Sequence, residues 1–212
     1  KTGPGLHRAL TALLLLAPET PMLFMGQEFG ASAPFLFFAD FPPGELARQI
    51  HQGRKQFLAQ FPSYASAGAQ AAVADPRDPA VFQRSKIDWS ERERYAGSVR
   101  LHRDLLRLRR EDPVIAQQAR DRLDGAVIGP AAFVLRYAGK QGDDRLLLIN
   151  LGADCDYRPA PEPLLAPPDG RTWHLLWSSD APEYGGPGVI EPLTETGWVI
   201  PGESAALYSV QG

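Results

Sequence analysis

The sequence has few of the residues that build disulfides and metal sites. Its 212 residues include one cysteine, Cys155, and four histidines, His7, His51, His102 and His174. A single cysteine excludes an internal disulfide and is too little for a structural zinc site. The histidines lack metal-ligand spacing, and neither an HExxH nor a GxSxG pattern occurs, which argues against a zinc hydrolase or a serine esterase.

Basic charge and long apolar runs are also scarce. The formal net charge is -3, so the chain lacks the basic excess that nucleic acids and anionic membrane surfaces attract. The most hydrophobic segment, residues 9–17, ends at Pro18 and is shorter than the ~20 apolar residues of a membrane-spanning helix. We therefore expect no nucleic-acid partner and no membrane. The single cysteine fits a cytoplasmic location, and a disulfide-free secreted protein is the alternative.

The first half of the chain has the pattern of an α/β fold. Residues 5–16 are apolar on all sides, which predicts a helix that is buried on every face. Residues 21–25 are an apolar run without alternation, as in a parallel strand that is covered on both faces. Residues 44–61 repeat apolar side chains at helical spacing, and Ser90 with Glu93 has the spacing of a capping box, which predicts the start of another helix.

Beyond Pro113 the apolar pattern becomes that of strands, and an antiparallel β-sandwich is predicted. We therefore predict an α/β part followed by an all-β part, with domains at residues 1–112 and 113–212. One buried strand cannot form a parallel sheet by itself, so residues 1–112 are expected to be the end of a larger domain. Short apolar runs bounded by turn-forming residues mark the strands at 133–137, 145–151, 173–177, 198–200 and 205–210.

Candidate binding residues follow the predicted strand. In a (β/α)8 barrel, binding groups lie at the carboxyl ends of the strands, and Glu28 has that place between Gly26 and Gly30. In the loop that follows, Phe37 could stack on the apolar face of a sugar ring, and Asp40 could accept hydrogen bonds from sugar hydroxyls. Two alternatives stay open: Glu28 could be an ion-pair partner at the strand end, and the phenylalanines of the loop could anchor it.

Three segments resemble the carboxyl-terminal part of the malto-oligosyltrehalose trehalohydrolase family, in the α-amylase superfamily. They are TPMLFMGQEFGASAPFLFFADF from residue 20, GRKQFL from residue 53 and SKIDWSE from residue 85. The resemblance implies that residues 21–26 are the eighth strand of a TIM (β/α)8 barrel. It also implies that the helix after Ser90 closes the barrel and that the β-rich remainder is the small carboxyl-terminal domain of amylase relatives.

The reaction that this resemblance implies is hydrolysis of the α-1,4 bond next to the terminal trehalose of maltooligosyl trehalose, which releases trehalose. The implied partners are maltooligosyl trehalose or a related α-glucan and the upstream part of the same barrel, and neither a metal nor an organic cofactor is implied. Fragments of a glucan branching enzyme and a non-catalytic carbohydrate-binding module are the alternatives.

A retaining glycosidase uses two carboxylates about 5–5.5 Å apart. The family's catalytic motifs, including Asn-His-Asp, do not occur in this sequence. We therefore expect no catalytic residue in the chain, which would form one wall of a cleft. Glu28, Phe37 and Asp40 are the residues that we expect to contact substrate.

Overall fold

The computed structural model describes residues 2–211, whose contacts divide the chain into two compact units. The first, which we call the sheet unit, comprises Lys1–Gly30 and Arg92–Gly212. The second, the helical unit, comprises Ala31–Glu91. No helix within residues 2–211 has the length and apolar character needed to cross a bilayer.

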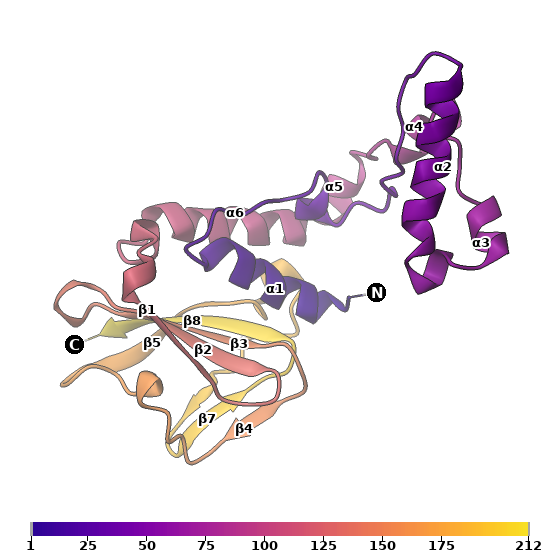
Figure 1. Cartoon of the computed structure of the whole chain (residues 1–212). Coiled ribbons are helices and arrows are strands. Elements are labelled where there is room, and N and C mark those ends of the chain that lie inside the picture. The colour runs from indigo at the N-terminus through magenta and orange to yellow at the C-terminus, as the bar shows by residue number, and fades with distance from the viewer. Residues whose placement is uncertain (1, 212) are drawn as a thin grey trace. The chain divides into compact units, whose positions relative to one another are not determined.

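The sheet unit contains two antiparallel sheets, one of five strands in the order β1-β2-β3-β8-β5 and one of three in the order β4-β7-β6 (Figure 1). Each predicted apolar run beyond residue 113 falls on one of these strands, so the antiparallel β-structure is confirmed. The strands are β1 (Leu123–Val127), β2 (Ala132–Tyr137), β3 (Arg145–Asn150), β4 (Cys155–Tyr157), β5 (Thr172–Ser178), β6 (Leu193–Thr194), β7 (Gly197–Ile200) and β8 (Ser204–Gln211).

Helices α1 (Pro4–Leu16) and α6 (Ala96–Glu111) cover one face of the five-stranded sheet (Figure 1). Leu147 of β3 packs in the core shared with these helices, whereas Leu146 belongs to the core on the opposite face, which includes β7. All six residues of β3 are buried because both faces of the sheet are covered. This explains why residues 146–149 of β3 are a continuous apolar run.

Buried arginines connect the two helices to each other and to the sheet. The guanidinium of Arg109, in α6, donates to main-chain oxygens at the end of α1, including that of Glu19 at 2.8 Å, so it satisfies carbonyls that the helix leaves unpaired. Arg145 in β3 forms a buried ion pair with Asp112 at the end of α6, with 2.8 Å between Nε and Oδ2. Helices and sheet therefore share one compact unit.

This packing gives a division that differs from the predicted domain boundary. In this chain residues on both sides of position 113 contact one another, and Ala31–Glu91 separates instead. The reason is that α1 and α6 bury their apolar faces against β3 and β8. Domains at residues 1–112 and 113–212 stay a prediction about a longer protein.

The helical unit contains α2 (Glu45–Ala59), α3 (Ala67–Ala71) and α4 (Pro79–Ser85). Helix α2 confirms the helix predicted at residues 44–61. Its expected apolar face is not buried, because Phe57 is 51% exposed and Leu46 is 60% exposed. This unit thus leaves large apolar side chains at its own surface.

Short helices connect the longer elements. Helix α5 (Glu91–Arg94) begins at the predicted helix start, where the Ser90 hydroxyl donates to the Asp88 carboxylate at 2.7 Å. The 3-10 helices are η1 (Gln27–Phe29), η2 (Pro62–Tyr64), η3 (Ile115–Gln117), η4 (Arg120–Arg122), η5 (Lys140–Gly142), η6 (Pro163–Leu165) and η7 (Pro182–Tyr184).

Two predictions for the first thirty residues are wrong in this chain. Residues 21–25 form no strand, and Met22 is 86% exposed, although the sequence predicts a strand buried on both faces. The physical reason is that no strand within residues 2–211 pairs with this run, so it has no hydrogen-bond ladder. Helix α1 forms as predicted but is not buried all round, because Leu10 is 40% exposed.

Candidate functional site

Glu28 lies on a tight turn, as its flanking glycines predict. Gly26 and Gly30 have φ of 80° and 64°, in the left-handed region where a side chain is disfavoured. They bracket η1, whose middle residue, Glu28, is half-buried. The turn that aims this carboxylate is therefore confirmed, whereas a role for Glu28 in substrate binding stays a prediction.

The phenylalanine-rich loop is fastened to α4 and to the segment before it. The main-chain N–H of Leu36 donates to the Ser85 hydroxyl at 3.1 Å, and that of Ala39 donates to the Pro76 carbonyl at 2.9 Å. Phe38 packs edge-on against Phe82 of α4, with 5.1 Å between ring centroids. Phe38 thus anchors the loop to α4, in line with the alternative that the phenylalanines anchor the loop.

Phe37 differs from Phe38 because part of its ring stays accessible. It is 39% exposed, and the guanidinium of Arg54, from α2, lies 5.5 Å from its ring centroid. The same guanidinium is 5.8 Å from the ring of Phe57. Arg54 therefore occupies part of the surface through which Phe37 could meet a ligand, at a distance where cation–π attraction acts.

A hollow of about 160 Å³ adjoins Phe37 and Arg54 within the helical unit. Its wall also includes Phe35, Tyr64 and Arg84, from the loop, η2 and α4. The sequence alone does not reveal Arg54 or this hollow, because the loop and α2 are brought together only by folding. The one available signal was the GRKQFL segment, which contains Arg54.

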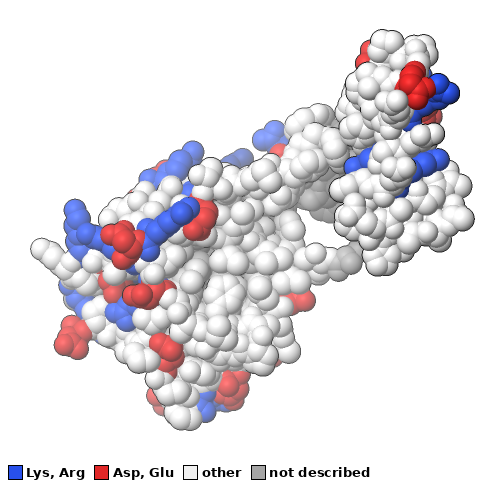
Figure 2. Space-filling view, viewed as in Figure 1, with Lys and Arg blue, Asp and Glu red and all other residues white. Residues whose placement is uncertain are grey.

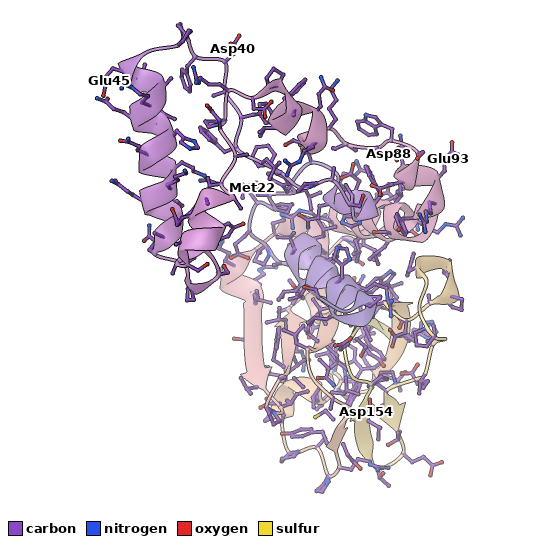
Figure 3. All side chains as sticks on the ribbon, turned by 90° about the vertical axis from the view of Figure 1, so that its right-hand side faces the viewer. Met22, Asp40, Glu45, Asp88, Glu93 and Asp154 are labelled. Carbon is purple, nitrogen blue, oxygen red and sulfur yellow. The ribbon has the colours of Figure 1, made fainter. Side chains whose placement is uncertain are left out.

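Asp40 lies further along the same loop and is exposed. Figure 3 shows its carboxylate pointing outward from the loop that precedes Glu45 and α2. Phe37 and Asp40 thus come from one loop of the helical unit, whereas Glu28 belongs to the sheet unit. Neither unit alone brings all three residues together.

The segment before α5 holds its polar groups in local contacts. The Asp88 carboxylate accepts hydrogen bonds from the hydroxyl and the main-chain N–H of Ser90, which lower the pKa of Asp88. The ammonium of Lys86 lies 5.0 Å from the ring centroid of Phe82. Trp89 is 64% exposed. Within residues 2–211 no three His, Cys, Asp or Glu side chains gather as a metal site would require.

Comparison with known proteins supplies the family. A malto-oligosyltrehalose trehalohydrolase from Deinococcus radiodurans is 42% identical over 154 residues, which are 72% of this chain and 24% of that protein. One from Arthrobacter ramosus is 48% identical over 119 residues, or 55% of this chain and 20% of that protein. The predicted resemblance to the malto-oligosyltrehalose trehalohydrolases is confirmed. The match spans about a quarter or less of the length of these relatives.

Solved structures of α-amylase family enzymes share the fold of the chain. A trehalose-6-phosphate hydrolase from Bacillus licheniformis has a TM-score of 0.56 at 13% identity and covers 98% of this chain and 39% of its own. The catalytic module of a glycogen-degrading pneumococcal virulence factor has a TM-score of 0.57 at 16% identity, over 97% of this chain and 31% of its own. A family described as "Domain of unknown function (DUF3459)" matches residues 120–207, so the β-rich half corresponds to a recognised family as well.

Proposed function

We propose that the chain is the carboxyl-terminal part of a glycoside hydrolase that cleaves the α-1,4 bond next to the terminal trehalose of maltooligosyl trehalose. The observation that carries this proposal is the 42% identity to a malto-oligosyltrehalose trehalohydrolase over 72% of the chain. The product would be free trehalose, made in the cytoplasm.

The structural role that we propose is the end of a (β/α)8 barrel followed by a β-sandwich domain. The exposed run at residues 22–25 supports it, because four consecutive large apolar side chains need a covering surface. Strands from the upstream part of the same barrel would pair with this run and bury Met22. The strand that the sequence predicts at residues 21–26 would then form in the longer protein.

The catalytic carboxylates of the proposed reaction would lie upstream, and this chain would supply one wall of the cleft. The accessible ring of Phe37 would stack on a sugar, and the exposed carboxylate of Asp40 would accept hydrogen bonds from hydroxyls. Glu28, on its turn between Gly26 and Gly30, would supply a second carboxylate that accepts hydrogen bonds from the substrate. A retaining mechanism, with a covalent glycosyl intermediate on an upstream carboxylate, fits the family.

Trehalose release from maltooligosyl trehalose tests the proposal, measured in parallel on the 212-residue chain and on a longer protein that contains it. We expect trehalose from the longer protein and none from the chain alone. Activity in the short chain would refute the upstream location of the catalytic groups. New branch points in a glucan, in place of trehalose, would indicate a branching enzyme, and glucan binding without any reaction would indicate a binding module.

A further inference from the structure

The hollow beside Phe37 lies wholly within the helical unit and is built from five segments. The loop contributes Phe35 and Phe37, α2 contributes Arg54, η2 contributes Tyr64 and α4 contributes Arg84. The residues that follow α3 close the remaining side. Its volume of about 160 Å³ is on the scale of one sugar ring. Three of its aromatic rings stay accessible, since Phe35, Phe37 and Tyr64 are 55%, 39% and 43% exposed.

The charges around the hollow disfavour a cation. Its described wall holds two arginines and no Asp or Glu, although Figure 2 shows both basic and acidic side chains elsewhere on this unit. Arg84 lies in the last turn of α4, and the wall includes Ala72, which caps the end of α3. The last carbonyls of a helix lack partners within the helix and can accept hydrogen bonds from hydroxyls. A neutral ring that carries hydroxyl groups fits donors and acceptors of both kinds.

Arg54 is a polar group of the wall that two aromatic rings hold. Its guanidinium is held against the rings of Phe37 and Phe57, at 5.5 and 5.8 Å from their centroids. An arginine beside aromatic rings keeps N–H groups that can donate hydrogen bonds. Arg48, also on α2, is different because it pairs with Glu45 at the surface. Arg54 is therefore preorganised to donate to a ligand in the hollow, and Arg48 is a matched control.

We infer that this hollow is a subsite for one glucosyl ring of an α-glucan, in which Phe37 and Tyr64 face the ring and Arg54 donates hydrogen bonds to its hydroxyls. The inference rests on the proposed function for the choice of glucan. It adds Arg54 and Tyr64 to the predicted ligand residues and places Phe37 in a defined cavity. A subsite would bind a sugar through both its arginine donors and its aromatic rings, whereas a simple gap in packing would bind no ligand.

Titration of the 212-residue chain with maltotriose, followed by NMR or calorimetry, tests the subsite. We expect saturable binding that Arg54→Ala weakens about tenfold, because a hydrogen bond from a charged group is lost. Arg54→Lys keeps the charge but loses the planar fork, and we expect it to restore only part of the affinity. Arg48→Ala should leave binding unchanged. Equal effects of the Arg54 and Arg48 variants, or no saturable binding by the unaltered chain, would overturn the inference.

A substitution that fills the hollow distinguishes a ligand subsite from a gap in packing. Ala74 lies in the wall of the hollow, so Ala74→Leu would place a side chain inside it. For a subsite we expect maltotriose binding to be lost while the circular dichroism spectrum is kept. A variant that melts at a higher temperature and binds maltotriose as before would show that the hollow is a gap and would refute the inference.

The longer protein separates failure of this inference from failure of the proposed function. If it releases trehalose and Arg54→Ala leaves KM unchanged, the subsite is wrong and the proposed function stands. If Arg54→Ala raises KM with little change in kcat, both stand, since the residue would bind substrate without taking part in the reaction. If the unaltered chain binds maltotriose while the longer protein releases no trehalose, the subsite stands and the proposed function fails.

Discussion

The two units of the chain use their apolar side chains in opposite ways. In the sheet unit Leu147 and Leu207 have no exposed surface, and each lies in a core between helices and sheet. In the helical unit Phe57 and Tyr64 are 51% and 43% exposed. Burial of apolar surface is the main favourable contribution to folding, so stability is concentrated in the sheet unit.

The difference in burial between the units also distinguishes side chains that pack in a core from side chains that are available to bind a ligand. A side chain such as Leu147 is explained fully by the neighbours that it contacts. Exposed aromatic rings beside Arg54 are not explained in that way, because their accessible faces contribute nothing to the stability of the unit. They are the places where a ligand or more of the protein chain would contribute the missing contacts.

The largest expected effect comes from the core of the sheet unit. We expect Leu147→Ala to lower the free energy of unfolding by about 3–5 kcal/mol, because it leaves a cavity where no side chain can reach solvent. Phe57→Ala removes a larger side chain from the helical unit but should cost less than about 1 kcal/mol, since half of that ring already contacts water. Urea unfolding followed by circular dichroism measures both.

Hydrogen exchange is an independent test of the difference in stability between the two units. Main-chain amides of β3 and β8 should be the last to exchange, and those of α2 among the first, because local opening costs least where few apolar contacts are buried. Equal losses of stability in the Leu147 and Phe57 variants, or equal protection of β3 and α2, would break the comparison between the units.

The buried ion pair at the end of α6 should have the next largest effect. Asp112→Ala removes the partner of Arg145 and an acceptor for two main-chain N–H groups. It leaves Arg145 buried, so we expect a loss of about 3 kcal/mol. Asp143, which contacts the same guanidinium, is 46% exposed at its side chain, and Asp143→Ala should cost less than about 1 kcal/mol. Similar losses in the two variants would show that burial is not what makes the pair important.

Sequence reasoning succeeded where a residue's local pattern decides its structure. The run at residues 145–151 predicts β3 because its residues 146–149 are continuously apolar, as in strands buried on both faces. Residues 21–25 have the same pattern and form no strand here, because a strand exists only with a neighbouring strand. The apolar pattern therefore indicates that a segment can form a strand, and the presence of a neighbouring strand decides whether the strand forms.

The same reasoning fails for long-range contacts of arginine. Arg109 and Arg145 each adjoin a charged residue in the sequence, and arginine is usually solvated, yet each is buried and bonded to distant groups. Arg54 was missed in the same way. Phe37 could be selected because a loop rich in phenylalanine is unusual, but no local pattern reveals that a guanidinium from α2 lies on its ring.

A smaller effect is expected from Tyr184 at high pH. Burial, and a hydrogen bond that its hydroxyl donates to Asp104, raise the pKa of Tyr184 from 10.0 to about 12. The folded state thus favours the protonated phenol, and this contribution is complete below pH 10 and is lost as the pH rises through about 12. We expect Tyr184→Phe to make stability fall less steeply between these pH values. Unfolding measured from pH 9 upward checks this, with Tyr64→Phe as the control for loss of an exposed hydroxyl.

The smallest effect on stability is expected at Met22, where a substitution should instead change the exposed apolar surface. This side chain is 86% exposed at the start of the apolar run at residues 22–25. Met22→Ser should change the free energy of unfolding by no more than about 0.5 kcal/mol, yet it should reduce the fluorescence of a dye that binds apolar patches. Val127, on β1, is also 80% exposed, and Val127→Thr should leave the dye signal unchanged if the continuous run binds the dye. In the longer protein the signal of the unaltered sequence should already be low, since upstream strands would cover Met22. A strong Met22-dependent signal there would contradict the proposed place of this run in a barrel.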